Sequence, residues 1–445
     1  MPTATGRRPR RGTEPDRCPA GPETGAGGAH HGAQGALAET VSGVETMIDR
    51  RNPDIVIAGA GAVGALLGYA LAMRGFEIAL IDAGGLDQQA SVRTSALSRA
   101  SLRRLCGLGL WPLAGVEAAP LRALRIVDHS GYGRLSFDSA DIGEADLGVI
   151  VNHGRLEAAL RAKAQVRGVS WHRDRAEGVE LGDTRIEVVM KGGGRLRAPL
   201  LIAADGAQSV IRERLGVAVL QYRYGQTAVC ADIRLGHTHE DTAWQRFLRH
   251  GPCALLPLPD ANRASLIWST ADYEAQRLRG LCDAEFSTAL NEAFGDHLGR
   301  LEVDGERAYF PLVASHAQHY VGTRFALVGD AAHRVHPLAG QGVNLGFADA
   351  CALIAALEAA RAQSADLGRR RTLRPYERER KASNLAMLAA TDVLNRAFAD
   401  DRAWVRAILR TGLNVTDTLP LFKTFFMHAA GAGIGQIAYG GGHGP

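Results

Sequence analysis

The chain has 445 residues, of which 46% are apolar and 22% charged, as in a soluble globular protein with a large core. Its formal net charge of +4 is small for this length and argues against nucleic-acid binding through phosphate neutralisation. The six cysteines form no CxxC pair and have no ligand-like spacing, so we expect neither a disulfide framework nor a zinc site.

The first fifty residues differ in composition from the rest of the chain. They are rich in Gly, Ala and Pro and contain almost no large apolar side chains. Such a segment cannot bury enough surface to fold, so we predict a disordered low-complexity tail over residues 1–50. A dispensable tail, or translation starting near Met47, is favoured over a targeting role, and no signal-peptide apolar region follows the arginines near the start.

One βαβ unit begins at Asp54. The apolar run to Ala58 predicts a buried strand, residues 65–74 predict a helix, and residues 76–81 predict a second buried strand. The uncharged stretch from Ile55 to Met73 is long enough to span a bilayer, but the spacing of its glycines favours a nucleotide-binding loop between strand and helix.

The loop of this unit reads Gly59-Ala60-Gly61-Ala62-Val63-Gly64, and Asp82 follows the second strand. In this context a GxGxxG pattern predicts dinucleotide binding. Gly59 permits the tight turn, Gly61 lets a pyrophosphate approach the helix start, and Gly64 lets the helix pack on the strand. Asp82 is expected to hydrogen-bond ribose hydroxyls. The pattern alone does not distinguish FAD from NAD.

The remaining chain alternates between strand-like and helix-like segments. Residues 221–313 contain short strands with Gly and Pro turns, which predicts an antiparallel sheet in a second domain. A charged region at 369–381 precedes a C-terminal part that looks helical. The other predicted elements are strands at 121–127, 133–138, 200–204 and 325–328 and helices at 155–165 and 343–357.

A second motif, from Ala204 to Arg212, follows a buried strand. It contains Asp205, Gly206 and Ser209, and as an isolated pattern it indicates only a turn.

A third motif begins with Gly329-Asp330-Ala331-Ala332-His333. Its carboxylate can bind a polyol chain, and the glycine-rich turn after it exposes backbone N–H groups at a helix start, which suits a negatively charged reduced flavin. A metal site could be read from Asp330, His333 and His336. We predict none, because binding a flavin would account for the glycines and the proline of this loop and no further cluster of ligands is evident. The continuation of the motif contains Pro337, Gly340, Gln341, Gly342 and Asn344.

Together the three motifs resemble those of class A flavoprotein hydroxylases, the p-hydroxybenzoate hydroxylase-like group. The resemblance implies an α/β fold: a discontinuous Rossmann-like FAD-binding domain, an inserted antiparallel-sheet substrate domain and a helical C-terminus. It places Asp205 and Gly206 near both flavin and nicotinamide, and Asp330 at the ribitol. It also implies that the loop from Pro337 to Asn344 lines the isoalloxazine.

Two smaller matches extend this resemblance. The segment that begins Arg93-Thr94-Ser95 is similar to an arginine-containing segment that contacts the flavin in these hydroxylases, with a solvated arginine as the alternative. Asn152 is similar to an amide-bearing position that meets the ADP part of FAD, with simple helix capping as an equal alternative.

Within this class the chain most resembles the ubiquinone-biosynthesis monooxygenases, through RTSALS at 93–98, HGPCALLPLP at 250–259 and SLIWS at 265–269. This implies that the enzyme hydroxylates the aromatic ring of a polyprenylated phenol with NAD(P)H and dioxygen, through a flavin hydroperoxide. We name no catalytic residue, because that chemistry demands no protein nucleophile or base.

Other functions stay open. One alternative is a hydroxylase or epoxidase of a soluble small molecule on the same scaffold, and a less favoured one is a non-catalytic nucleotide-binding protein. A flavin halogenase is disfavoured because the chain has no WxWxIP segment.

We expect a cytoplasmic protein, with peripheral contact at the inner membrane face as an option. The expected partners are the apolar phenol and dioxygen, with the membrane surface or quinone-biosynthesis proteins as further options. The apolar cluster from Leu419 to Met427 could touch lipid, although core or subunit packing is the commoner role of such clusters.

The predicted divisions are a tail (1–50), FAD-binding parts (51–120, 151–220 and 314–371), substrate-domain parts (121–150 and 221–313) and C-terminal helices (372–445).

Overall fold

The computed structural model describes residues 52–84, 92–128, 133–336 and 342–399. All of these residues belong to one structural unit. Several predictions concern residues outside these ranges: the N-terminal tail, the cofactor contacts of Pro337, Gly340 and Gln341, and the apolar cluster from Leu419 to Met427.

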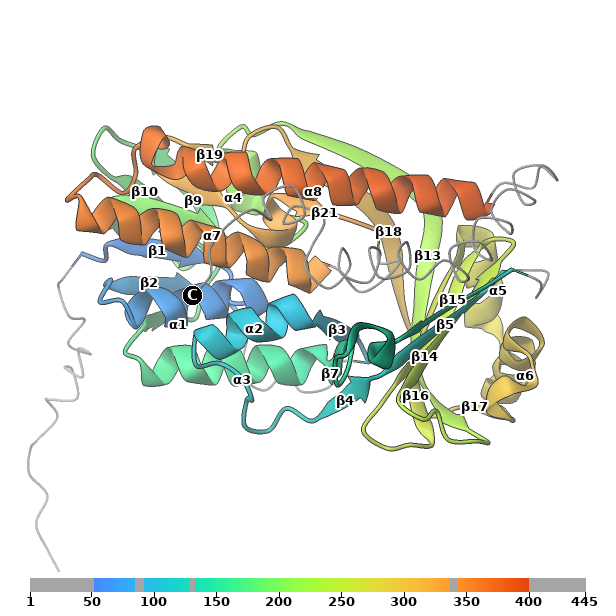
Figure 1. The fold of residues 1–445 in the computed structure, drawn as a ribbon. Coiled ribbons are helices and arrows are strands. Elements are labelled where there is room, and N and C mark those ends of the chain that lie inside the picture. The colour runs from blue at the N-terminus through green and yellow to red at the C-terminus, as the bar shows by residue number, and fades with distance from the viewer. Residues whose placement is uncertain (1–51, 85–91, 129–132, 337–341, 400–445) are drawn as a thin grey trace, which may run out of the picture. The chain divides into compact units, whose positions relative to one another are not determined.

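A six-stranded sheet carries the three sequence motifs, with strand order β19-β20-β12-β1-β2-β8 (Figure 1). Strand β1 lies between β12 and β2, parallel to both, and β20 runs parallel to β12. Because the carboxyl ends of parallel strands share one edge of a sheet, the turns that follow β1, β12 and β20 meet there. The strands are β1 (Ile55–Ala58), β2 (Ile78–Ile81), β8 (Ser170–His172), β12 (Leu200–Ala203), β19 (Val321–Gly322) and β20 (Phe325–Leu327).

Burial explains why these strands are uninterrupted apolar runs. Every residue of β1, β2 and β12 is buried, as expected for parallel strands that are covered on both faces. Helix α1 packs against α3 and α7, and α7 packs against α8 (Figure 1). The helices near this sheet are α1 (Ala62–Ala72), α2 (Arg99–Gly107), α3 (His153–Val166), α4 (Val210–Arg214), α7 (Gly342–Ala362) and α8 (Arg370–Ala399).

The large second sheet has nine strands in the order β21-β18-β13-β16-β15-β14-β5-β6, with β17 paired to β13. All its pairings between described strands are antiparallel except β14 with β5, so the predicted antiparallel sheet is present and includes the two strands expected near residues 121–138. Its strands are β5 (Ala123–Val127), β6 (Arg134–Asp138), β13 (Val219–Leu235), β14 (Thr242–Leu248), β15 (Gly251–Pro257), β16 (Arg263–Ala271), β17 (Leu301–Val303), β18 (Ala308–Ala317) and β21 (His333–Arg334).

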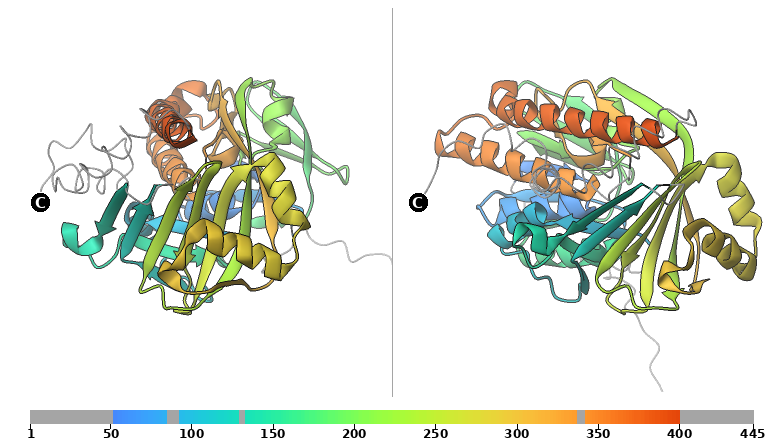
Figure 2. Two further views of the ribbon diagram at one scale, coloured as in Figure 1. Left: turned by 90° about the vertical axis from the view of Figure 1, so that its right-hand side faces the viewer. Right: turned by 45° about the vertical axis from the view of Figure 1, so that its right-hand side comes forward.

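Two helices that the sequence analysis missed cover one face of this sheet: α5 (Asp272–Gly280) and α6 (Asp283–Phe294) (Figure 2). Phe286 and Leu290 of α6 are fully buried in a core with Trp268 of β16. The opposite face of the sheet is therefore the one available to the cleft described below.

Two smaller sheets complete the fold. The first, β3-β7-β4, brings Thr94 opposite Asn152, so the two smaller motif matches are neighbours. The second is antiparallel, in the order β11-β10-β9. Their strands are β3 (Thr94–Ser98), β4 (Ala118–Leu121), β7 (Gly148–Asn152), β9 (Ala176–Leu181), β10 (Ile186–Met190) and β11 (Arg195–Ala198); the short 3-10 turns are Ser139–Ile142, Asp296–Leu298 and Gly329–Ala331.

Several predicted boundaries are wrong. Helix α1 begins at Ala62, inside the glycine fingerprint rather than after it, because Gly61 is already its N-cap. The charged region at 369–381, apart from Arg369, belongs to α8 instead of preceding the helical part. Strand β13 has 17 residues, although only short strands were expected there. By contrast, the stretch from Ile55 to Met73 is a strand and a helix joined by the glycine loop, as predicted.

Among the described residues, α7 is the helix whose length and composition would allow it to cross a membrane. Within its most apolar window 72% is buried inside the protein, as in a core helix of a globular domain.

Candidate active site

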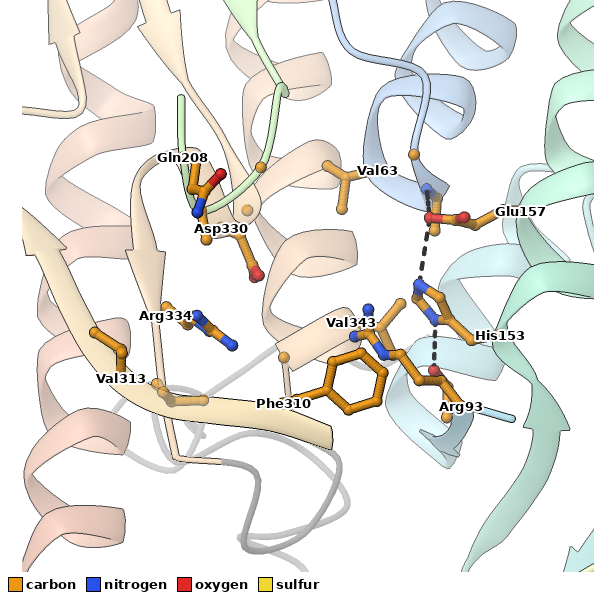
Figure 3. Close-up of a pocket in the computed structure, with 18 of the residues that line it drawn as sticks. Val63, Arg93, His153, Glu157, Gln208, Phe310, Val313, Asp330, Arg334 and Val343 are labelled. Carbon is orange, nitrogen blue, oxygen red and sulfur yellow. Dashed lines mark hydrogen bonds and ion pairs between the residues drawn. The ribbon is translucent and has the colours of Figure 1, made fainter. Parts of the chain in front are cut away.

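A cleft of about 610 Å³ lies where the three motif turns meet. This volume falls in the range of small-molecule and cofactor sites. Figure 3 shows Arg93, His153 and Glu157 on one side of the cleft and Gln208, Asp330 and Arg334 on the other. Seven of the predicted cofactor-binding residues line the cleft: Gly61, Arg93, Asp205, Gly206, Gly329, Asp330 and Gly342. Six others that are described do not line it: Gly59, Gly64, Asp82, Asn152, Arg212 and Asn344.

The three glycines of the first motif face different surroundings. Gly59 has a φ of +98°, and a Cβ there would lie 2.3 Å from the carbonyl oxygen of Ala204. A Cβ on Gly64 would lie 1.9 Å from the carbonyl oxygen of Gly59, so this glycine permits helix and loop to touch. Among the described residues, the added Cβ at Gly61 would meet only the carboxylate tip of Glu157, at 3.2 Å. Gly61 is therefore the position whose missing side chain leaves room for a ligand.

Asp82 braces the first turn. Its carboxylate accepts hydrogen bonds from the backbone N–H groups of Ala60 and Gly84, both at 2.7 Å. The buried Arg161 donates from Nε to the carbonyl oxygen of Ala60 at 2.7 Å, and its Nη2 lies 3.7 Å from Asp82 Oδ1. The proposed ribose contact of Asp82 stays a prediction, and its visible role is to fix the loop.

The second motif presents a carboxylate with an unused acceptor. Asp205 Oδ2 accepts from the backbone N–H of Ile211 at 3.1 Å, while Oδ1 is buried without a hydrogen-bond partner among the described residues. Burial raises the pKa of Asp205. The adjacent Gly206, at φ +82°, has no atom of the described part of the chain within 4 Å of where a side chain would begin. A bound ligand with hydroxyl or amide donors would complete this site.

Arg212 links the second motif to the third instead of pointing into the cleft. Its Nη2 donates to the carbonyl oxygen of Ala207 at 3.0 Å, and its Nη1 donates to that of Ala331 at 2.8 Å. Ser209 caps the short helix α4 by accepting from the backbone N–H of Arg212 at 3.0 Å. These contacts hold the two turns at a fixed separation.

The third motif is anchored from behind by Asp349, which sequence reasoning missed. Gly329 donates its N–H to Asp349 Oδ2 at 3.1 Å, and His333 Nε2 donates to the same oxygen at 2.5 Å. Arg380 and Asn384 of α8 donate to Oδ1 at 2.9 and 3.1 Å. Although burial alone would raise the pKa of Asp349, His333 and Arg380 hold it below its usual value. Asp330, by contrast, is exposed on the cleft.

Asn344, at the start of α7, ties this helix to β3. Its Oδ1 accepts from the backbone N–H of Ser98 at 3.0 Å, and its Nδ2 donates to the carbonyl oxygen of Ala96 at 2.8 Å. Gly342, at the first position of the helix, has no atom of the described residues within 4 Å of an added Cβ. The start of α7 is thus held in place while its first residue stays open to the cleft.

A hydrogen-bonded chain of three side chains lines the wall near Gly61. Ser95 Oγ lies 2.8 Å from His153 Nδ1, and His153 Nε2 lies 3.2 Å from Glu157 Oε1 (Figure 3). Glu157 also accepts from the backbone N–H of Ala62 at 3.2 Å. Asn152 caps α3 by accepting from the backbone N–H of Arg155 at 3.0 Å, which agrees with the capping alternative. The sequence analysis did not name His153 or Glu157, although their spacing of four residues on a helix is a signal that the two side chains can meet.

The remaining wall of the cleft is apolar and comes from the large sheet. Arg93 lies over the ring of Phe310 with 5.4 Å between the guanidinium carbon and the ring centre. Burial raises the pKa of Cys230 to about 11, so its thiol remains neutral. This wall, which we call the apolar wall, consists of Ala228, Cys230, Ile267, Phe310, Leu312 and Val313.

The residues present fit FAD. The cleft joins an uncrowded glycine and helix start at Gly61, an exposed carboxylate at Asp330 and a second open helix start at Gly342. Helix starts favour anionic groups, and carboxylates accept hydrogen bonds from hydroxyls. Asp205, whose Oδ1 has no hydrogen-bond partner among the described residues, follows β12, which lies between β1 and β20 in the sheet. A dinucleotide that carries a diphosphate and a polyol chain could contact these helix starts and carboxylates at the same time.

The comparisons with known proteins agree with this arrangement. A model of the FAD binding domain family matches residues 52–391. The ubiquinone hydroxylase UbiL of Rhodospirillum rubrum is 36% identical over 396 residues, covering 85% of this chain and 89% of that protein. The 3-demethoxyubiquinol 3-hydroxylase of Escherichia coli is 33% identical, covering 83% and 96%.

Solved structures show the same fold. The crystal structure of p-nitrophenol 4-monooxygenase PnpA from Pseudomonas putida DLL-E4 superposes with a TM-score of 0.71 at 18% identity, over 86% of this chain and 98% of that one. The predicted fold class, an FAD-binding domain with an antiparallel sheet and a helical C-terminus, is confirmed. This chain therefore belongs to the family of FAD-dependent monooxygenases that includes the ubiquinone hydroxylases.

Proposed function

We propose that this monooxygenase hydroxylates the aromatic ring of a polyprenylated phenol in ubiquinone biosynthesis, with NAD(P)H and dioxygen as co-substrates. The observation that carries the proposal is the cleft that joins all three motif turns to the apolar wall. The named activities of the two relatives supply the substrate class. A cleft that is polar along one side and apolar along the other suits a cofactor and a phenolic ring together.

Each part of the cleft has a proposed task. Gly61 and the start of α1 receive the diphosphate, Asp330 and Asp205 accept hydrogen bonds from the polyol and ring, and the start of α7 at Gly342 faces the anionic end of the flavin. When bound, FAD supplies the redox chemistry that passes electrons from NAD(P)H to dioxygen and one oxygen atom to the ring. The apolar wall orients the substrate ring and excludes water.

We also propose contact with the membrane surface, because a polyprenylated substrate resides in the bilayer. Large exposed apolar side chains occur on two neighbouring elements: Leu220 and Tyr222 of β13 and Val393 of α8. The two elements are in contact there, since Arg396 of α8 lies 5.1 Å from the centre of the Tyr222 ring. Co-sedimentation with anionic vesicles should fall when these three residues are changed to serine, and unchanged binding would refute this placement.

The test of the proposed function compares substrates. Purified enzyme with FAD should couple NAD(P)H oxidation to hydroxylation of a prenylated phenol, and should produce little hydroxylated product from the same phenol without its chain. Quinone profiling of a strain lacking this chain should show one accumulated intermediate, which identifies the ring position. Equal coupling with both phenols would favour a hydroxylase of a soluble small molecule instead.

A further inference from the structure

A carboxylate lies at the helix start that the diphosphate of FAD is proposed to use. Glu157 of α3 lines the cleft, and its Oε1 accepts from the backbone N–H of Ala62, the first residue of α1, at 3.2 Å. The same oxygen lies 3.2 Å from the position of a Cβ added to Gly61. Figure 3 shows Glu157 extending from α3 toward this helix start. The side chain therefore holds a backbone donor that an incoming anion would use.

Glu157 and a diphosphate have the same partner. The N-cap of α1 is Gly61, which has no side chain that could accept from the first N–H groups, and the first turn of the helix contains no acidic residue. A carboxylate from α3 supplies the missing acceptor and interacts favourably with the helix dipole. A diphosphate at this point would supply the same acceptor with more negative charge. The two anions thus compete for one helix start.

The carboxylate of Glu157 is ionised at neutral pH. Burial alone would raise its pKa, but the hydrogen bonds from His153 and from the N–H of Ala62 hold the pKa below its usual value. His153 Nε2 lies 3.2 Å from Glu157 Oε1, and the two side chains are 17% and 21% exposed, so solvent reaches both. A diphosphate at the start of α1 would therefore meet a negative charge that can take up a proton from water.

The charges around Glu157 do little to offset a second anion. The first turn of α1 is uncharged. Arg161 of α3 lies 3.7 Å from Asp82, which largely matches its charge. Arg93, which precedes β3, lies over an aromatic ring of the apolar wall, and His153 is the basic side chain hydrogen-bonded to the carboxylate. The remaining charged residues that line the cleft are Asp205, Asp330 and Arg334.

We propose that the binding of FAD is coupled to the uptake of a proton by Glu157. This inference rests on the proposed function, which places the diphosphate at the start of α1. A proton from solvent adds to the carboxylate, an O–H bond forms, and the N–H of Ala62 passes from Glu157 to a phosphate oxygen. The neutral carboxyl group donates a hydrogen bond to the phosphate instead of repelling it.

The affinity for FAD should fall as the pH rises. A neighbouring diphosphate raises the pKa of Glu157 in the complex above its value in the protein without FAD, because like charges disfavour ionisation. Between these two pKa values the complex holds a proton that the protein without FAD lacks. In that range each rise of one pH unit weakens binding by up to about tenfold. Above both values the affinity is constant and at its lowest.

The variant Glu157→Gln removes the charge and keeps an acceptor for the N–H of Ala62. At about pH 7 its Kd for FAD, measured by titration of flavin fluorescence, should be at least about tenfold lower than that of the wild type, the effect of one unit of pKa shift. Its Kd should also change less between about pH 5 and pH 8. Both proteins keep His153, Asp205 and Asp330, so the difference between the two pH profiles belongs to Glu157.

Glu117→Gln is the matched control. Glu117 also lies beside α3, with its carboxylate 3.3 Å from Arg155, but it is 71% exposed and does not line the cleft. The same change of charge at this position should leave FAD affinity and its pH profile as in the wild type. Equal or weaker FAD binding by Glu157→Gln would overturn the inference, because the carboxylate would then be indifferent to the cofactor or a ligand of it.

Calorimetry measures the proton directly. The full chain, freed of FAD, is titrated with FAD in buffers that differ in their enthalpy of ionisation. The heat for the wild type should vary with the buffer in the sense of net proton uptake, and Glu157→Gln should show less uptake. Heat that is independent of the buffer in the wild type would refute the coupling even if the variant failed to fold.

The variant Gly61→Ala separates this inference from the proposed function. Unchanged FAD affinity in Gly61→Ala would mean that the diphosphate lies elsewhere, and the placement given under the proposed function would fail. Weaker FAD binding by Gly61→Ala, together with no gain in affinity by Glu157→Gln, would leave that placement intact and refute only the role of Glu157.

Discussion

Changing Gly61 to alanine should separate cofactor binding from folding. The new Cβ would meet only the flexible carboxylate of Glu157, at 3.2 Å, and Gly61 has a φ of −60° that alanine adopts without strain. Alanine is a poorer N-cap than glycine, but it also reduces the entropy of the unfolded chain, and these effects of up to about 1 kcal/mol nearly cancel. The melting temperature of the apoprotein should therefore stay within a few degrees of wild type.

The cost of the same substitution should appear in FAD affinity. A methyl group at the helix start displaces the diphosphate from at least one backbone donor, and a hydrogen bond to a charged group contributes about 1.5–3 kcal/mol. At about 1.4 kcal/mol per tenfold, the Kd for FAD, measured by titration of flavin fluorescence, should rise by about 10- to 150-fold.

Gly64→Ala is the matched control. Its Cβ would lie 1.9 Å from the backbone oxygen of Gly59, so the apoprotein itself should be destabilised, by more than the roughly 1–3 kcal/mol typical of overpacking. Unchanged FAD affinity in Gly61→Ala would refute the placement of the diphosphate.

Three further substitutions probe the other turns. Asp349→Asn should lower the free energy of unfolding, measured by urea titration, by about 3–5 kcal/mol, because Arg380 is left without its buried counter-ion. A change below about 1 kcal/mol would contradict the anchoring role of Asp349. Asp205→Asn should stabilise the apoprotein at pH 7 but not at pH 3. Burial raises the pKa of the Asp205 carboxyl in the folded state, so ionising this group lowers the stability of the wild type as the pH rises through that pKa. Equal shifts of the melting temperature at both pH values would contradict this. Asp330→Ala should weaken FAD binding without changing the apoprotein's melting temperature, since Asp330 is exposed, and full flavin retention after gel filtration would count against its role.

The parallel sheet could be predicted because its signals are local. The apolar runs of β1, β12 and β20 each end at a glycine-containing turn, and strands that end in nucleotide-binding turns align in parallel. The places of Asp205 and Asp330 at one cofactor came from the resemblance to class A flavoprotein hydroxylases, because the second motif by itself indicates only a turn. The start of α1 was misjudged because the fingerprint glycines look like loop residues, although Gly64 lies within the first helical turn.

The apolar wall could not be predicted in the same way. Ala228, Ile267 and Phe310 come from three strands, and their meeting depends on register, which includes a shift in β13 between Arg223 and Thr227. Alternation within one strand does not specify which strand pairs with it.

The support behind the third motif is equally non-local. Asp349 and Arg380 look like ordinary polar residues of two helices, and only the packing of α7 on α8 reveals their buried pair. Predicting such pairs requires the three-dimensional arrangement, because either residue alone would be read as exposed.

The most direct test of the whole account is turnover under isotopically labelled dioxygen. The FAD-loaded enzyme, supplied with NAD(P)H and a prenylated phenol, should yield a product that carries one labelled oxygen atom on its ring. A product without the label, or NAD(P)H oxidation that yields only hydrogen peroxide with every prenylated phenol tried, would contradict the claim that this cleft performs aromatic hydroxylation.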